Sequence, residues 1–348
     1  LCKRRLETQV NRAQIDADQA IFFSKILVWL SSTGTGDKSE INLNRRGHDL
    51  LWSRINGDSS DYCGIRHGNC FLRKARDLAS ESDLLVVNHS LLMANIKSGM
   101  TIIPDHDCLI LDEAHHLEKE ATNAFGFEIT SELIQEIADR LSGGDSILDT
   151  ATRLIKNQTN SKGDLSSLDT IRSRINTTSE ILKNTVTALL GELSLAIFDS
   201  TSEEAQLPHD SKIRIVSSHR NTVWNDVTLL ANKLSVGISS TVSDVESLVF
   251  RLSTYMNIEG TADMVAEINN IKSDLTDFNN KLVEVTLEPV EDSVYWITRR
   301  GNRKTPALCM APTEIATKLT ESLYDRTPTI VMTSATLTSN DDFNYFVT

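Results

Sequence analysis

The sequence between residues 130 and 288 repeats apolar side chains at helical spacing, and Pro208 is the only proline between Pro104 and Pro289. One apolar seam advances by four and three positions in turn and consists of Met264, Ile268, Ile271, Leu275, Phe278 and Leu282. A comparable stripe consists of Leu168, Ile171, Ile175, Leu182, Leu189 and Leu193. A helix with one apolar seam must bury it against a partner, so this pattern predicts antiparallel helices in one domain. A free-standing coiled-coil dimer is the alternative, and it is disfavoured by strand-rich sequence on both sides.

The sequence before this helical region has the pattern of an α/β protein. Residues 26–30 are expected to form a short strand or the end of a helix, and residues 73–79 a helix. Residues 83–89 and 108–111 are apolar runs that end in polar groups, which is typical of strands. Ser90 is expected to cap an apolar helix.

The α/β pattern returns after the helical region. Residues 294–297 and 307–310 flank a basic turn and predict a hairpin. Residues 313–323 are expected to be helical, and residues 329–332 to form a buried strand. Strands that alternate with helices predict a parallel sheet.

The apolar run 108–111 leads directly into two adjacent carboxylates, Asp112 and Glu113, and then into His115 and His116. The carboxyl end of a parallel strand is where ligand sites form in such sheets. One carboxylate can hold Mg²⁺ while its neighbour orients an attacking water, so the pair suits magnesium-nucleotide chemistry. The alternative is an acidic start of a solvated helix, because carboxylates favour first turns.

Two short motifs connect the chain to a known family. Residues 112–115 (Asp-Glu-Ala-His, a DEAH box) and residues 334–336 (Ser-Ala-Thr) resemble motifs II and III of superfamily 2 helicases. The two motifs are 334 − 113 = 221 residues apart, which leaves room for a domain, as in the XPD/DinG branch. The strings at residues 1–7, 87–92 and 111–118 resemble bacterial DinG-type helicases, so the resemblance covers essentially the whole chain.

The resemblance implies an α/β fold with a RecA-like parallel-sheet motor domain that is incomplete in this chain. It implies an iron–sulfur-type subdomain with motor segments at 1–82, a motor segment with motif II at 83–128, a helical arch-like insertion at 129–290 and the motor return with motif III at 291–348. The chain starts at Leu1 and stops inside an apolar segment. It is therefore expected to be an internal fragment that lacks the phosphate loop and the second motor domain and is inactive alone.

The same resemblance assigns roles to five residues. Asp112 would bind Mg²⁺ and Glu113 would orient the hydrolytic water, so both would contact the ATP–magnesium complex. His115 would connect the nucleotide site to the rest of the motor. Ser334 and Thr336 would couple hydrolysis to strand movement. The implied activity is that of an ATP-dependent DNA helicase that moves 5′ to 3′ and serves DNA repair.

Residues 33–39 imitate a phosphate loop, but the chemistry does not fit. A phosphate loop needs Lys directly after its second glycine, and Asp37 stands there instead. Ser31 occupies the position of the required upstream glycine. A carboxylate would repel phosphates, so we do not expect nucleotide binding at this segment.

DinG and XPD relatives often hold a [4Fe–4S] cluster through four cysteines before motif II. Cys2, Cys63 and Cys70 lie in the matching region, and one cysteine of the family pattern is missing. His67 is the candidate fourth ligand, since His replaces Cys in Rieske-type centres. A degraded domain without a cluster and an incomplete cluster are the alternatives.

The remaining composition points to an intracellular protein. Cys108 and Cys309 lie in apolar strands and are expected in the core, and five cysteines do not suggest a secreted disulfide scaffold. No apolar run is long enough for a membrane span, so a cytoplasmic location without membrane contact is expected. The net charge of −13 excludes a generally basic nucleic-acid coat, but basic segments at 3–5, 73–76 and 299–304 are candidates for phosphate contact.

Three functional hypotheses follow. The first is a monomeric ATP-dependent helicase on single-stranded or forked DNA. The second is a DinG-like motor that is fused to an exonuclease domain and has lost unwinding. The third is a non-catalytic nucleic-acid-binding scaffold that uses the helical insertion for docking, and the intact pair of Asp112 and Glu113 argues against it.

Overall fold

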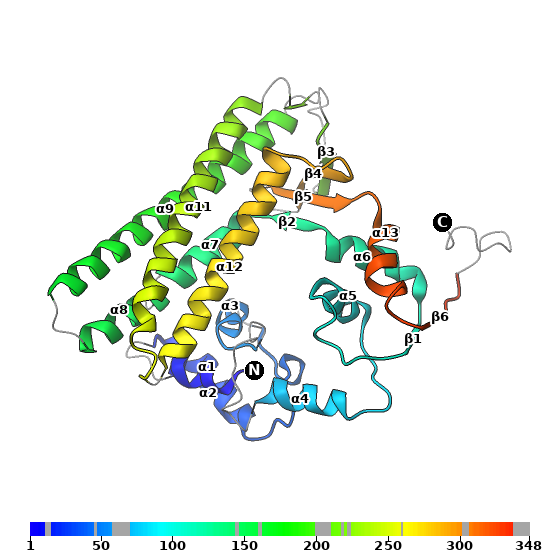
Figure 1. The fold of residues 1–348 in the computed structure, drawn as a ribbon, viewed down its shortest axis with the longest axis horizontal. Coiled ribbons are helices and arrows are strands. Elements are labelled where there is room, and N and C mark those ends of the chain that lie inside the picture. The colour runs from blue at the N-terminus through cyan, green and yellow to red at the C-terminus, as the bar shows by residue number, and fades with distance from the viewer. Residues whose placement is uncertain are drawn as a thin grey trace. The chain divides into compact units, whose positions relative to one another are not determined.

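Figure 1 shows the fold in a computed structural model of the chain, which divides into two compact units. The first unit comprises Leu1–Asn88 with Met100–Asp105, and the second comprises His89–Gly99 with His106–Thr348. The structure describes residues 1–10, 15–44, 47–57, 70–142, 146–158, 162–198, 210–216, 219–220, 224–258, 260–300 and 306–336.

The described part of the first unit is helical. Its elements are α1 (Lys3–Val10), α2 (Ala17–Leu30), the 3-10 helix η1 (Lys38–Glu40), α3 (His48–Ser53) and α4 (Phe71–Ser80). The run 26–30 is thus the end of a helix, and the helix predicted at 73–79 is confirmed. The core of this unit consists of Leu6, Phe22, Phe23, Ile26, Leu43, Trp52 and Ile55.

The strand predicted at residues 83–89 is wrong. No ladder pairing is found for this run among the described residues, and α5 (His89–Lys97) begins at its end. Leu84 and Val86 are 79% and 87% exposed, so the described residues of the first unit do not cover the apolar run. The cap predicted at Ser90 is also wrong, because Ser90 lies within α5 and its hydroxyl donates to Glu120 Oε2 at 2.9 Å.

The second unit contains a pair of parallel strands. β1 (Cys108–Leu111) pairs with β6 (Thr329–Met332) over four residues, from Cys108 opposite Thr329 to Leu111 opposite Met332. This confirms both predicted strands and their parallel arrangement. The expectation that residues 329–332 are buried is wrong, because Thr329 and Val331 are exposed. Leu111 is buried whereas Cys108 is exposed, so the expectation that Cys108 is a core residue is wrong. The face of this two-stranded sheet that carries Cys108 and Ile110 is left uncovered by the described residues.

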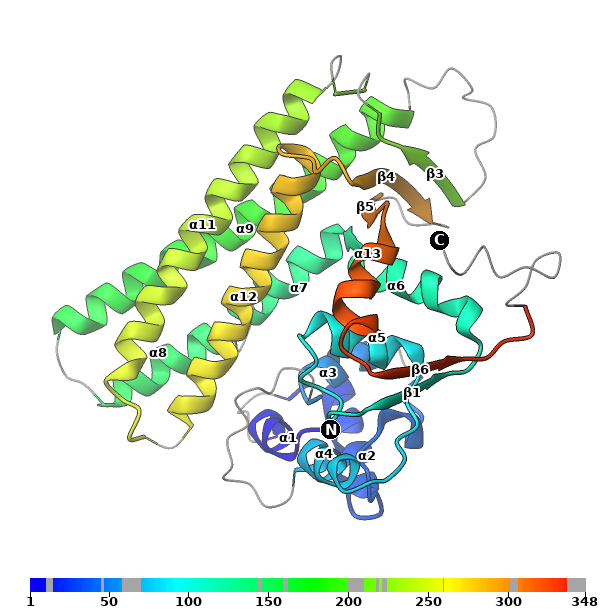
Figure 2. The same cartoon turned by 45° about the vertical axis from the view of Figure 1, so that its right-hand side comes forward.

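A bundle of long helices follows, as the apolar seams predict. It consists of α7 (Ser131–Ser142), α8 (Ile147–Gln158), α9 (Lys162–Phe198), α11 (Trp224–Ser253) and α12 (Thr261–Thr286). All residues of both predicted seams are buried in one core. Figures 1 and 2 show α9, α11 and α12 side by side. No helix in the described ranges has both the length and the apolar content to cross a membrane.

Contacts along α9 and α11 show that the two helices are antiparallel. Arg174 pairs with Asp244, and further along α9 the side chain of Leu182 lies against Gly237. Residue numbers therefore rise on one helix as they fall on the other. This is the arrangement expected for seams buried within one chain.

A four-stranded antiparallel sheet closes one end of the bundle. Its strands are β2 (Phe127–Ile129), β3 (Asp210–Arg214), β4 (Ser293–Arg300) and β5 (Ala307–Pro312), in the order β2-β5-β4-β3. The predicted hairpin is confirmed as β4 and β5, whereas β2 and β3 were not predicted. Ile129, Ile297 and Leu308 belong to the same hydrophobic core as the bundle helices. This core therefore includes residues on both sides of position 290. The four domain ranges stay predictions.

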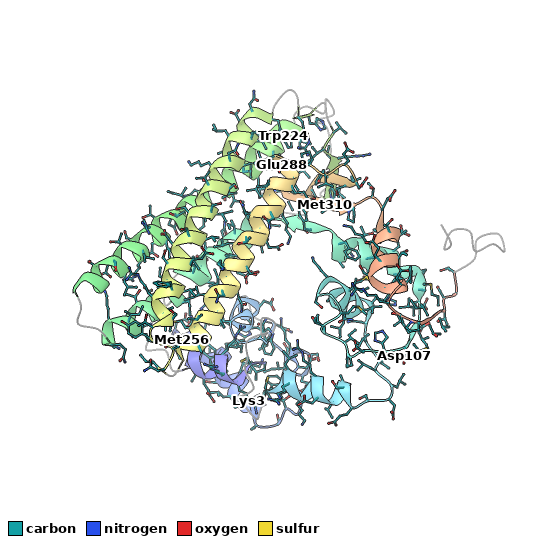
Figure 3. All side chains as sticks on the ribbon, in the orientation of Figure 1. Lys3, Asp107, Trp224, Met256, Glu288 and Met310 are labelled. Atoms are coloured by element: carbon teal, nitrogen blue, oxygen red, sulfur yellow. The ribbon has the colours of Figure 1, made fainter. Side chains whose placement is uncertain are left out.

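Aromatic and cationic side chains at the start of α11 and just before it bind the end of α12. Trp224 Nε1 donates to the Thr286 carbonyl at 2.9 Å, and Arg220 donates to the Val285 carbonyl at 2.8 Å. The Arg220 guanidinium lies 4.8 Å from the Trp224 ring centroid and 5.7 Å from that of Tyr295. Burial raises the pKa of Tyr295. Figure 3 shows Trp224 and Glu288 at this end of the bundle and Met256 at the other.

Candidate functional site

The backbone beyond β1 and β6 continues their pairing and forms the frame of the site. Thr333 N donates to the Leu111 carbonyl at 2.8 Å, and Ala114 N donates to the Thr333 carbonyl at 3.0 Å. In a regular parallel ladder the amide of Glu113 would donate to the Thr333 carbonyl, so the pairing is displaced by one residue at Glu113. The segment that carries Asp112 and Glu113 is therefore held against the segment that carries Thr333.

Glu113 adopts a left-handed backbone conformation, with φ 51° and ψ 45°. For a residue with a side chain this conformation costs roughly 1–2 kcal/mol. Such strain persists only where neighbouring contacts fix the backbone, and it is frequent at functional sites. Here the fixed neighbours are Ala114, which is fully buried, and the short helix η2 (Ala114–His116).

Ser334 connects the side chains that follow the two strands. Its Oγ lies 2.6 Å from His115 Nδ1 and 3.4 Å from Glu113 Oε2. His115 Nδ1 is in turn 3.2 Å from Glu113 Oε2. A serine hydroxyl carries one hydrogen, so donation to Glu113 leaves its oxygen free to accept from a protonated Nδ1. The three groups thus form one hydrogen-bonded cluster.

Asp112 is fixed by two hydrogen bonds to the same carboxylate oxygen. Its Oδ1 accepts from the backbone N of Glu113 at 3.0 Å and from Thr333 Oγ1 at 2.8 Å. The second oxygen, Oδ2, takes part in neither bond. The second bond comes from Thr333, directly after β6, so Asp112 and Glu113 are each tied to the segment that follows β6.

The structure brings four of the predicted site residues together: Asp112, Glu113, His115 and Ser334. Thr336 is attached through its backbone N, which donates to Ser334 Oγ at 3.3 Å. The catalytic roles of all five stay predictions.

Sequence reasoning missed Thr333. Two features of the sequence could have indicated it: Thr333 directly precedes Ser334, and it follows an apolar strand. Side chains at that end of the strand lie at the same edge of the sheet as the carboxylates that follow β1.

The carboxylates fit a magnesium ion that is bound together with a nucleotide. Mg²⁺ in nucleotide-hydrolysing sites is held by one or two carboxylates, phosphate oxygens and water. Asp112 and Glu113 are exposed, so water and phosphates can reach them. The described residues contain no group of three or more His, Cys, Asp or Glu side chains that could hold a metal by themselves. A magnesium ion at this edge would therefore take its remaining oxygen ligands from water or from a nucleotide.

The candidate iron–sulfur ligands are only partly placed. Cys2 and Cys70 are free thiols in the first unit, and Cys63 and His67 lie outside the described residues. Lys3 follows Cys2 in the sequence, and Phe71 follows Cys70. Lys3 Nζ lies 4.6 Å from the Phe71 ring centroid, so the residues next to the two cysteines are in contact. This contact brings two of the four candidates into one region.

Residues 33–39 form a turn whose side chains bind one another. Thr33 Oγ1 donates to Glu40 Oε2 at 2.6 Å, and the Thr35 hydroxyl donates to the other carboxylate oxygen. These bonds lower the pKa of Glu40. Asp37 accepts from Ser39 N at 2.8 Å and caps η1. The contacts give this segment a structural role.

The basic segments differ in how much of them is described. Arg73, Lys74 and Arg76 are exposed on α4. The side chains of Arg299 and Arg300 and all of residues 301–305 lie outside the described part. Phosphate contact by α4 is therefore compatible with the exposure of its cations.

A parallel strand pair that ends in adjacent carboxylates, tied to hydroxyl side chains of the second strand, defines a candidate nucleotide-hydrolysing site. No family model matches the chain. The whole chain is 24% identical to the 3′-5′ exonuclease DinG of Bacillus subtilis (strain 168), over 37% of that protein. It is 22% identical to the ATP-dependent DNA helicase DinG of Photobacterium profundum over 86% of the chain and 42% of that protein.

A shorter part of the chain is more similar to a third relative. Over 147 residues it is 32% identical to the ATP-dependent DNA helicase YoaA of Escherichia coli (strain K12). This alignment covers 40% of the chain and 23% of that protein. The predicted resemblance to DinG-type helicases is confirmed by these comparisons. The chain spans less than half the length of each of these three relatives.

Proposed function

We propose that the chain is part of a DinG-type, ATP-dependent DNA helicase that couples hydrolysis of Mg-ATP to translocation on DNA and unwinding of it. The observation that carries the proposal is the hydrogen-bonded connection between β1 and β6, in which Thr333 binds Asp112 and Ser334 binds Glu113 and His115. Phosphoryl transfer depends on positioning and charge neutralisation more than on covalent chemistry by the protein. Adjacent carboxylates on a fixed frame meet that requirement.

Each residue has a defined part in this proposal. Asp112 binds the magnesium ion, which neutralises charge on the phosphates when it is bound. Glu113 accepts a hydrogen bond from the attacking water and orients it towards the terminal phosphate. His115 and Ser334 hold Glu113 in place, and Thr336 supports Ser334 through the bond from its backbone N.

We assign the coupling of hydrolysis to DNA to Ser334. It lies directly beyond β6, and β6 is reached only after the helical bundle and the antiparallel sheet. A displacement of β6 relative to β1 would change the hydroxyl contacts to Glu113 and His115. The position of β6 and the positioning of the attacking water would then depend on each other.

The finer domain assignments belong to the same proposal. We assign β1 and β6 to a RecA-like motor domain and the bundle of α7 to α12 to an arch-like insertion. Cys2, Cys63, Cys70 and His67 are proposed as ligands of a [4Fe–4S] cluster. The protein would act as a monomer on single-stranded or forked DNA in the cytoplasm, with the cations of α4 contacting phosphates.

One alternative has support of its own. The Bacillus subtilis relative that aligns with the whole chain is named a 3′-5′ exonuclease. The corresponding protein would combine a DinG-like motor with a nuclease domain and would not unwind DNA. The scaffold hypothesis has no comparable support.

The test uses the protein at its full natural length, with wild type and Asp112→Asn side by side. We would measure ATP hydrolysis with and without single-stranded DNA, unwinding of a forked duplex, and shortening of a labelled single strand. The proposal expects DNA-stimulated hydrolysis and unwinding, both lost in Asp112→Asn. Strand shortening from the 3′ end without unwinding would indicate the exonuclease alternative. DNA binding without any ATP hydrolysis would indicate the scaffold.

A further inference from the structure

Thr333 makes three hydrogen bonds to the last residue of β1 and to the segment that follows it. Its backbone N and carbonyl bond to Leu111 and Ala114 at 2.8 and 3.0 Å, and its Oγ1 donates to Asp112 Oδ1 at 2.8 Å. The two backbone bonds fix the position of the threonine relative to β1. The hydroxyl is therefore presented to Asp112 by a rigid frame and not by a mobile loop.

We propose that Thr333 is a positioning residue that selects which carboxylate oxygen of Asp112 binds the metal ion. The inference rests on the proposed function. A carboxylate oxygen has about two lone-pair sites for hydrogen bonds. On Asp112 Oδ1 both are used, one by the backbone N of Glu113 and one by Thr333. Oδ2 takes part in neither bond, so it is the oxygen that we assign to the cation.

Loss of the threonine hydroxyl has a defined consequence. Only the bond from the backbone N of Glu113 would then hold the Asp112 carboxylate. The group could rotate and would present its oxygens to the cation in more than one orientation. Removing a hydrogen-bond partner of a metal-binding carboxylate typically weakens metal affinity about 10- to 100-fold. The exposed position of Asp112 places the expected effect near tenfold.

This role is separate from that of the neighbouring serine. Ser334 bonds to Glu113 and His115, which belong to the water-positioning part of the site. Thr333 bonds to Asp112, which belongs to the metal-binding part. Two adjacent hydroxyls on one strand end thus hold two adjacent carboxylates on the other.

The test compares Thr333→Val, which keeps the shape and removes the hydroxyl, with Thr333→Ser, which keeps the hydroxyl. Both are made in the full-length protein, and thermal unfolding confirms that each variant folds. Mn²⁺ replaces Mg²⁺, and its binding in the presence of a non-hydrolysable ATP analogue is followed by electron paramagnetic resonance. The Mg²⁺ concentration for half-maximal ATP hydrolysis is measured separately from kcat.

We expect Thr333→Val to weaken Mn²⁺ binding about tenfold and to raise the half-maximal Mg²⁺ concentration by the same factor, with a smaller change in kcat. Thr333→Ser should restore wild-type Mn²⁺ affinity. Unchanged Mn²⁺ affinity in Thr333→Val, or a serine variant as weak as the valine variant, would overturn the inference. Asp112→Asn separates failure of the inference about Thr333 from failure of the proposed function. If Asp112→Asn leaves Mn²⁺ binding unchanged, the proposed function itself fails.

Discussion

Ser334 Oγ lies 2.6 Å from His115 Nδ1, although 219 positions separate the two residues in the sequence. The contact exists because β6 pairs with β1, although the bundle and the antiparallel sheet lie between the two strands in the sequence. A change in either strand end therefore reaches the same cluster of side chains. This arrangement gives the first prediction.

Ser334→Ala should uncouple ATP hydrolysis from DNA in the full-length protein. The change removes the hydroxyl that Glu113 and His115 share. Hydrogen bonds to charged groups contribute about 1.5–3 kcal/mol, so the DNA-stimulated rate should fall roughly tenfold or more. Ser82→Ala is the matched control, since that hydroxyl donates to the nearby Leu78 carbonyl, far from the carboxylates in the sequence. Equal DNA-stimulated rates in wild type and Ser334→Ala would refute the coupling role.

Leu189→Ala should destabilise the helical bundle. Leu189 is fully buried in α9, and truncation of a buried leucine costs about 2–5 kcal/mol. Leu195 of the same helix is 54% exposed, so Leu195→Ala should change the free energy of unfolding by less than about 0.5 kcal/mol. Urea unfolding followed by circular dichroism measures both. Equal shifts of the two midpoints would mean that the seam is not packed as described.

Two glycines should respond to alanine in opposite directions. A Cβ on Gly126 would lie 2.6 Å from the Met310 carbonyl oxygen and 2.8 Å from that of Thr122. Gly126→Ala should therefore lower the free energy of unfolding by about 1–3 kcal/mol, as overpacking does. Gly191 lies inside α9 with open space around it, so Gly191→Ala should raise this free energy by about 0.5–1 kcal/mol. Thermal unfolding of both variants checks the sign of each effect.

Glu40 should titrate abnormally because of its threonine partners. The hydrogen bonds from Thr33 and Thr35 lower its pKa from the ordinary value of 4.5. As the pH falls, Glu40 is therefore protonated at a higher pH in the unfolded chain than in the folded protein. The stabilising contribution of the ionised carboxylate is present above pH 4.5 and is lost as the pH falls through the lowered pKa.

Thr33→Val should raise the pKa of Glu40 towards its ordinary value, because it removes the largest of the lowering contacts. Thr33→Ser keeps a hydroxyl and should leave the pKa low. Titration of the Glu40 carboxyl by nuclear magnetic resonance measures the value in each protein. A pKa that does not move in Thr33→Val would show that the turn is not formed as described.

Local patterns in the sequence predicted the long elements of the fold. The seams through Ile268 and Leu189 carry helical periodicity over several turns, and each had to be buried. β1 and β6 were predicted because each is an apolar run with polar residues at its end. A parallel sheet was predicted from the alternation of strands with helices, but the direct pairing of β1 with β6 was not.

Features that depend on distant partners were missed or predicted wrongly. β2 and β3 have three and five residues, too few for a clear alternation of apolar and polar side chains. The apolar run at 83–89 resembles a strand, but a strand needs a neighbour to pair with. Cys108 was expected in the core, and its face of a two-stranded sheet is uncovered by the described residues. Thr333 was missed because its importance lies in one contact with Asp112.

The most direct test of the central claim is the rate of ATP hydrolysis by Glu113→Gln in the full-length protein, at saturating single-stranded DNA and Mg²⁺. Glutamine keeps the size of the side chain and removes its charge and basicity. We expect turnover to fall at least about 100-fold, as when a group that positions or deprotonates the nucleophile is lost, while ATP affinity changes little. Turnover equal to that of the wild type would contradict the assignment of this strand end as the hydrolytic site.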